Sequence, residues 1–345
     1  MTDSRTATGP GAGRVEWVDV AKGLCIALVV LLHTVNFMAT RQLAETWWFD
    51  VNAVLEPVRM PLFFLVAGLF AGRDLDMSWN GLWRKRVALL LYLYVLWLLL
   101  RFALFSTFPR ISGTNEASSA ANIVVGLINP GSGLWFLYAL IVYTCLARVL
   151  RSVDPRLQVV GAALVAIIGP TLVEDFSWTW VKIVSFLLFF LIGVHFKSLV
   201  FGVAQATTGW STALWPMGFV SLYFLSPLLP TSGLLNSWTV AAALSMVGVV
   251  SGIVFCVYIQ HRRIAVPLRR LGSLSLPIYL LHEIILGTAI TIGVASGLEP
   301  SRFWIAPLVV TAAVLALAAT LGSALRDRSR LFRLPRRWQP SRALA

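Results

Sequence analysis

The stretch Arg14–Phe37, RVEWVDVAKGLCIALVVLLHTVNF, is an apolar segment long enough to span a membrane, and it holds two ionisable residues, Lys22 and His33. Eleven positions separate them, which on an α-helix is about three turns and about 16 Å, so both side chains lie on one face. Asp19 and Asn36 extend this face at its two ends. Ionisable groups are unfavourable in hydrocarbon, so we expect this face to line an interior cavity and to belong to a functional site.

The composition of the whole chain predicts an all-α, polytopic membrane protein surrounded by membrane lipids. Of its 345 residues, 58% are hydrophobic and 12% are charged, and the mean hydropathy is +0.80. The net charge of +13 comes from short basic clusters between apolar runs, a pattern typical of orientation signals, so we expect no nucleic-acid partner. Cys25, Cys145 and Cys256 are widely spaced within apolar runs and predict neither disulfides nor a metal site.

Hydropathy predicts about ten spanning helices, with a polar tail at 1–13, a membrane domain at 14–325 and a basic tail at 326–345. The expected spans are Val18–Phe37, Val51–Gly72, Val87–Phe105, Gly133–Leu150, Leu157–Val173, Trp180–Phe196, Gly209–Leu225, Trp238–Ile259, Leu271–Val294 and Phe303–Leu325. The fifth and seventh are the weakest, because each is interrupted by proline or glycine. We expect the first tail to be disordered, and Ile123–Ile128 is too short to span.

Arginine and lysine place both termini in the cytoplasm under the positive-inside rule. With the N-terminus inside, the expected inner loops hold most of the cations, namely Arg73, Arg84, Lys85, Arg86, Arg148, Arg151, Arg156, Lys197, Arg262, Arg263, Arg269 and Arg270. The expected outer loops hold only Arg41, Arg110 and Arg302.

His33 is the strongest candidate for catalysis, because an imidazole is the side chain best suited to proton transfer near neutral pH. Lys22 has a simpler alternative role, since it could pair with Asp19 near the inner interface. Arg59 opens the apolar run VRMPLFFLVAGLFAG and has two readings: an arginine that snorkels to the outer interface, or a fixed cation facing the cavity of His33. Pro61 could free a backbone carbonyl nearby.

Further candidates lie in three other motifs. In LSLPIYLLHE, Tyr279 and His282 share a face and could line a polar pocket, whereas Glu283 is turned about 100° away and is expected to be a paired structural carboxylate. The cluster of Arg84, Lys85 and Arg86 either orients the chain in the membrane or binds the phosphates of a donor. In GLWFLYAL, Trp135 is either an interfacial anchor or a pocket residue.

Four of these segments together resemble the integral-membrane acyltransferase 3 family, especially its fucose 4-O-acetylase-like branch. They are RVEWVDVAKGLCIALVVLLHT, which matches the family's pattern of a basic residue, ten residues and a histidine, and RMPLFFLVAGL, GLWFLYAL and LSLPIYLLH. The resemblance implies ten helices in a bacterial inner membrane and transfer of an acetyl or other acyl group from cytosolic acyl-CoA to a hydroxyl of a sugar, glycan or lipid-linked glycan. It implies that His33 is the general base and that Lys22 and Arg59 are supporting cations.

The same resemblance implies acyl-CoA as a co-substrate rather than a permanently bound cofactor, with Arg84, Lys85 and Arg86 as its binding residues. The family has two arginines three positions apart at this point, but here Trp83 stands three before Arg86. Asp19, Asn36, Trp135, Tyr279 and His282 are the expected substrate-pocket residues. Two alternatives remain open, namely an acyl-histidine intermediate in place of direct transfer, and a transporter or flippase for a glycolipid or polyol with His33 in a proton relay.

Overall fold

The computed structural model describes residues 15–108, 119–131, 133–229, 236–297, 304–326 and 329–335. Within these ranges every regular element is a helix and none is a strand, which confirms the all-α prediction. The expected disordered tail at 1–13, part of the basic tail, Arg110 and Arg302 lie outside the described residues.

Nine helices in the described part of the chain are long and apolar enough to cross a membrane, which confirms a polytopic membrane protein. They are α1 (Glu16–Ala39), α2 (Trp47–Leu69), α5 (Ala88–Thr107) with the helical turns that lead into it, α7 (Trp135–Val149), α8 (Pro155–Val173), α9 (Trp178–His195), α12 (Ser237–Ile259), α14 (Ser275–Ala295) and α15 (Ala306–Leu325). Shorter helices are α3 (Gly72–Leu75), α4 (Trp79–Leu82), α6 (Ala121–Ile128), α10 (Lys197–Gln205), α11 (Ser211–Leu225) and α13 (Ala265–Ser273).

The expected span Gly209–Leu225 forms α11, which has 15 residues and is followed by a 3₁₀ turn at Ser226–Leu228. With this turn the segment is as long as α7 (Trp135–Val149) with its own turn at Leu150–Ser152, so length does not separate the two. The prolines Pro216 and Pro227 and several serine and threonine residues lower the hydropathy of the α11 segment, and it is not among the nine. The described chain therefore has nine helices of spanning length where hydropathy predicts ten. The sidedness of the two termini stays a prediction.

The predicted start of the span Leu271–Val294 is wrong, because the helix is interrupted at Leu274, between α13 and α14. The cause is a close contact between α13 and α1. A Cβ on Gly272 would lie 2.0 Å from the carbonyl oxygen of Asp19, and a Cβ on Gly23 would lie 1.9 Å from that of Leu268. Only glycine allows the two backbones to approach this closely, so α13 lies against α1 and α14 begins as a separate helix.

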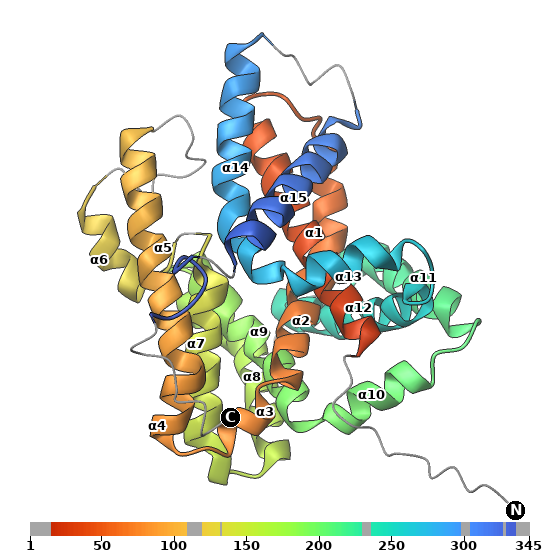
Figure 1. Ribbon diagram of the computed structural model, residues 1–345. Helices are drawn as coiled ribbons and strands as arrows, with labels where there is room; N and C mark the ends of the chain where they lie inside the picture. The colour runs from red at the N-terminus through yellow and green to blue at the C-terminus, as the bar shows by residue number, and fades with distance from the viewer. Residues whose placement is uncertain are drawn as a thin grey trace, which may run out of the picture.

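Helix α1 is the central element of the bundle and contacts α2, α12, α13, α14 and α15. Figure 1 shows α14 and α15 beside α1, with α5 and α6 set apart from it toward the left. Most residues of α1 are buried, which agrees with its high apolar content. The polar face of this helix therefore meets side chains from several neighbours.

Helix α2 contains two prolines, Pro57 and Pro61, and continues through both. Proline has no N–H, so the carbonyl oxygens four residues earlier, on Ala53 and Pro57, have no donor within the helix. The helix packs against α1, α9 and α12. The prediction that Pro61 frees a carbonyl agrees with this geometry.

The short segment Ile123–Ile128 forms most of α6, which packs against α5. The Tyr94 hydroxyl donates a hydrogen bond to the carbonyl oxygen of Gly126, and Leu98 lies against the same glycine. Side chains of α5 therefore hold α6, which does not cross the membrane on its own.

Candidate active site

A cluster of charged and polar side chains from three helices lies inside the bundle. The Nε2 atom of His33, on α1, lies 3.5 Å from Oε1 of Glu283, on α14. The other carboxylate oxygen of Glu283 accepts a hydrogen bond of 2.5 Å from Arg101 on α5. Arg101 and Glu283 are 2% and 4% exposed, while the His33 side chain is 25% exposed, so the imidazole is the accessible end of this chain of contacts.

His282 is the fourth member of this cluster. Its Nδ1 atom lies 2.7 Å from the carbonyl oxygen of Tyr279, one turn earlier on α14, which fixes the orientation of the ring. The Nε2 atom therefore points toward Glu283, whose Oε1 is 3.9 Å away. The His33 and His282 rings lie 5.1 Å apart. The Nε2 atom of His282 is buried without a hydrogen-bond partner, a rare state for a polar atom.

The turn before α7 shapes the space around the Glu283 carboxylate. A Cβ on Gly133 would lie only 1.9 Å from Oε1 of Glu283, so no other residue fits there without moving the carboxylate. The Tyr279 hydroxyl donates a hydrogen bond of 2.5 Å to the carbonyl oxygen of Gly133. The loop backbone thus joins Tyr279 to the cluster.

Three groups in the cluster could ligate a metal ion, because one atom each from His33, His282 and Glu283 lies within 4.8 Å of the others. Arg101 opposes this use. Its guanidinium already neutralises Glu283 at 2.5 Å and adds a fixed positive charge beside any cation. The donor set is better suited to holding and moving a proton.

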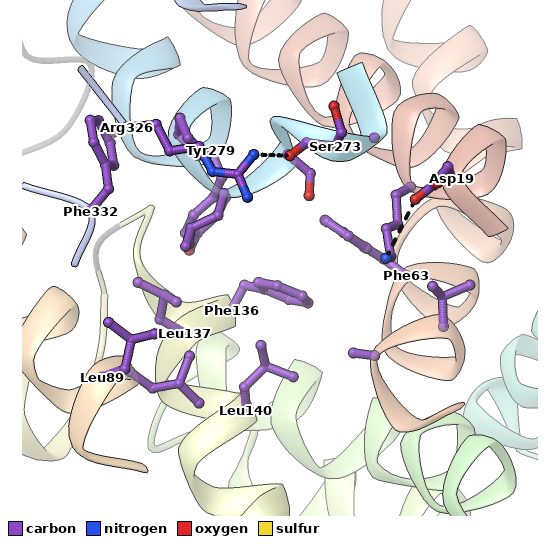
Figure 2. A pocket seen from close by; sticks show the side chains of 18 of the residues that line it. Asp19, Phe63, Leu89, Phe136, Leu137, Leu140, Ser273, Tyr279, Arg326 and Phe332 are labelled. Carbon is purple, nitrogen blue, oxygen red and sulfur yellow. Dashed lines mark hydrogen bonds and ion pairs between the residues drawn. The ribbon is translucent and has the colours of Figure 1, made fainter. Parts of the chain in front are cut away.

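A cavity of about 530 Å³ lies at the end of the bundle where α1 and α14 begin and α2 and α15 finish. We call it the Lys22 cavity, and Figure 2 shows it from close by. Its walls are largely apolar, with Phe63, Phe136 and Leu140 among them, and it also contains charged residues. These are Asp19, Lys22, Arg326 and Arg333.

The segment 329–335 closes one side of this cavity. Phe332 is 4% exposed and lies near the ring of Trp97 on α5. The Trp97 indole donates a hydrogen bond of 2.9 Å to the carbonyl oxygen of Leu331. Arg326 donates to the carbonyl oxygen of Ser273, and Figure 2 shows it beside Tyr279 and Phe332. The residues after α15 are thus part of the cavity wall.

The predicted polar face of α1 divides between these two places. Lys22 lies 3.8 Å from Asp19, and both line the Lys22 cavity, so the expected pairing of the two residues is present. Lys22 also lies over the ring of Phe70. His33 belongs to the inner cluster. Asn36 is exposed and is not brought into either site.

Arg59 is 3% exposed, which contradicts the alternative in which it snorkels to the interface. Its Nη1 atom lies 3.4 Å from the amide oxygen of Asn52, and Arg59 does not line the Lys22 cavity. Arg59 interacts electrostatically with His33 and with Glu56. It is a buried cation close to the cluster but not a residue of that cavity.

The basic residues expected to hold phosphates form a π-helical turn, Trp83–Val87, ahead of α5. Lys85 and Arg86 both pair with Asp74, at 3.0 and 3.3 Å, and Arg84 is exposed. None of the three lines the Lys22 cavity, although Arg86 donates to the carbonyl oxygen of Ala67, which does. Their expected role in binding a donor stays a prediction.

Of the remaining expected pocket residues, Tyr279 joins the two places. It lines the Lys22 cavity, and its ring lies 6.1 Å from that of His282. Trp135 lies farther off, where its ring contacts Phe64 and Phe186 and Lys182 lies over it.

Sequence reasoning missed two residues of the cluster. Glu283 was assigned a structural role, and although it is paired as expected, it also lies beside His33. Arg101 was overlooked, and its signal was a single charge within the apolar run LLLYLYVLWLLLRFALF.

A family model described as an acyltransferase domain, Acyl_transf_3, matches residues 15–324. The chain is 24% identical over 296 residues to the inner membrane protein YcfT of Escherichia coli (strain K12), covering 78% of this chain and 79% of that protein. No solved structure matches the chain.

Proposed function

The chain belongs to the acyltransferase 3 family and is a multi-pass bacterial inner-membrane protein, and we propose that it transfers an acyl group from acyl-CoA to a hydroxyl of a sugar or glycan. One observation supports this most: His33 lies 3.5 Å from a carboxylate that Arg101 holds at 2.5 Å. A partly exposed imidazole oriented by a buried carboxylate is the arrangement that general-base catalysis of acyl transfer requires.

In the proposed step, Glu283 faces Nε2 of His33 and favours the tautomer with the proton on that nitrogen. The lone pair on Nδ1 then accepts the proton of the acceptor hydroxyl as its oxygen attacks the thioester carbonyl. The C–O bond forms, the C–S bond breaks, and the thiolate leaves and is protonated. Glu283 stabilises the imidazolium while it exists, and Arg101 keeps Glu283 ionised and in position.

Two further features support a place for the donor in the Lys22 cavity. Apolar walls suit the acyl chain and the long arm of CoA, and the cations Lys22, Arg326 and Arg333 suit its phosphates. Arg326 and Arg333 line this cavity, whereas Lys85 and Arg86 do not, so we assign the first phosphate contacts to Arg326 and Arg333. The thioester would then lie near Tyr279, toward the cluster.

Arg59 supplies the remaining proposed element, a positive charge for the oxyanion that develops on the thioester carbonyl. Its Nε atom is buried without a hydrogen-bond partner, and the guanidinium interacts electrostatically with His33. A fixed donor of this kind is worth most where water is excluded.

The test is release of free thiol from acetyl-CoA by purified protein in proteoliposomes, with and without a glycan acceptor. His33→Ala should lower the rate about a hundredfold or more. His195→Ala is the matched control, because that histidine pairs with Gln158 on α8, away from the cluster, and it should keep the wild-type rate. Wild-type turnover by folded His33→Ala protein would contradict the proposal.

A further inference from the structure

A second cavity, of about 330 Å³, lies where α2, α9 and α12 begin and α8 and α11 finish, at the opposite end of α2 from the Lys22 cavity. We call it the Glu56 cavity. Side chains of several chemical kinds line it: Glu56, Lys182, Ser185, Ser245, Trp178 and Trp238. The function proposed above leaves these residues without a role.

Two opposite charges face this cavity. Glu56, on α2, and Lys182, on α9, interact electrostatically but do not form a salt bridge in the described part of the chain. Lys182 instead lies 5.4 Å from the ring centroid of Trp135. Charges within membrane-spanning helices are unfavourable unless they pair with each other or bind a ligand. Two opposite charges that face a cavity without forming a salt bridge therefore indicate a binding site.

Aromatic rings complete the lining. The Trp178 and Trp238 rings lie 6.0 Å apart at 48° to each other, and Phe186, Phe189 and Tyr223 add further apolar surface. Ala53 and Pro57 also line the cavity. Flat apolar faces thus alternate with hydrogen-bonding groups.

This combination favours one kind of ligand. A pyranose ring has an apolar C–H face that packs on indole and hydroxyl groups that need both donors and acceptors. A lipid chain would make no use of Glu56 or Lys182. The volume of about 330 Å³ is near the lower limit of the roughly 300–1,000 Å³ of ligand pockets, which suits a single ring.

We propose that the Glu56 cavity binds the sugar ring of the acceptor, an inference that rests on the proposed acyl transfer. Glu56 accepts hydrogen bonds from ring hydroxyls, Lys182 donates to them, and Trp178 and Trp238 cover the ring face. Arg59, about one helical turn after Glu56 on α2, interacts electrostatically with both Glu56 and His33.

The position of Trp135 supports a path from the Glu56 cavity to the catalytic cluster. Its ring lies 6.2 Å from that of Phe186, a cavity residue, and 5.8 Å from that of Phe64 on the inner side of α2. Helix α2 itself contributes Glu56 and Pro57 to this cavity and Phe63 to the Lys22 cavity. Donor and acceptor would therefore reach His33 from opposite ends of α2.

The experiment measures sugar binding to the full chain in lipid nanodiscs, by equilibrium dialysis with radiolabelled fucose, rhamnose, glucose, galactose and N-acetylglucosamine and no acyl donor. Wild-type protein should bind at least one of these sugars saturably. Glu56→Gln and Trp238→Ala should each weaken that binding about tenfold or more, since each removes a contact to the sugar. Thermal melting checks that each variant is folded.

Matched controls separate a specific site from a general effect. Glu174→Gln and Trp210→Ala change the same residue types at exposed positions outside the cavity and should bind as wild type does. Absence of saturable binding for all five sugars, or unchanged binding in Glu56→Gln, would overturn the proposal, and so would competition by dihexanoylphosphatidylglycerol at equal concentration. The binding assay contains no donor, so its result does not depend on acyl transfer. Saturable sugar binding, together with no thiol release in the separate acetyl-CoA assay, would uphold this site while contradicting the proposed reaction.

Discussion

Two acid–base pairs in the spanning helices differ sharply in their surroundings. Arg101 and Glu283 lie 2.5 Å apart with side chains 2% and 4% exposed, whereas Lys22 and Asp19 lie 3.8 Å apart and are 27% and 10% exposed. The first pair is fixed between two helices, and the second lies along one helix and faces a cavity. We infer that the buried pair holds the catalytic geometry, whereas the open pair can exchange its partner for a ligand.

Removing the carboxylate of the buried pair should have the largest effect. Glu283→Ala removes the carboxylate that pairs with the buried Arg101, so we expect a loss of about 3–5 kcal/mol of stability. Glu283→Gln keeps the shape but not the charge, and should lower kcat about a thousandfold with little change in KM for acetyl-CoA. Thermal melting and thiol release measure the two effects.

The double variant Arg101→Leu/Glu283→Leu tests whether the two effects separate. Apolar replacement of both partners should recover much of the stability that Glu283→Ala loses, because no buried charge remains unpaired. Activity should stay low, since His33 no longer faces a carboxylate. A double variant with wild-type activity would contradict the role of the buried pair.

Moving the carboxylate without removing it should have a smaller effect. In Gly133→Ala the added Cβ would lie 1.9 Å from Oε1 of Glu283, so the carboxylate has to shift. We expect the rate to fall about ten- to a hundredfold, as for a small misplacement of a catalytic group. Gly131→Ala is the control, because a Cβ there meets nothing within 4 Å, and an equal loss in both variants would show a loop effect instead.

The open pair should respond more weakly and mainly in donor binding. Lys22→Met removes one of the cations of the Lys22 cavity, and KM for acetyl-CoA should rise about two- to fivefold with the melting temperature nearly unchanged. The effect should shrink at high salt. Lys197→Met is the matched control, since Lys197 also lies over a phenylalanine ring but outside the cavity. A fall in kcat alone would contradict this assignment.

Asn36 should matter least, although it shares the polar face of α1 with Lys22 and His33. Its side chain is exposed, so Asn36→Ala should change thiol release by less than about twofold, as surface substitutions usually do. A fall of more than tenfold in the rate of thiol release would contradict this prediction and would indicate that Asn36 belongs to the site.

Most of the fold followed from hydropathy, because an apolar run of spanning length has few other structures available in a membrane. The structure differs from the hydropathy prediction in two places. The break at Leu274 depends on the approach of Gly272 to the α1 backbone, which no single-helix pattern contains. The second difference, at Gly209–Leu225, lies in composition, because Pro216 and the hydroxyl residues of α11 lower the hydropathy of this segment.

The site was predicted only in part, for a similar reason. A helical wheel relates His33 to Lys22 on the same helix, but it cannot say which neighbour faces each residue. Glu283 was set aside because it is turned away from His282 on α14, yet that turn directs it toward Arg101 and His33. The fucose 4-O-acetylase-like branch and the donor role of Arg84, Lys85 and Arg86 stay predictions.

The segment 329–335 has a consequence for how the protein matures. It follows α15, so the ribosome releases it only after every described spanning helix has been made. Phe332 and the hydrogen bond from Trp97 to Leu331 then add the last wall of the Lys22 cavity. Insertion into the membrane and completion of the Lys22 cavity are therefore separate events in biogenesis, and a chain cut after Leu325 would reach the first without the second.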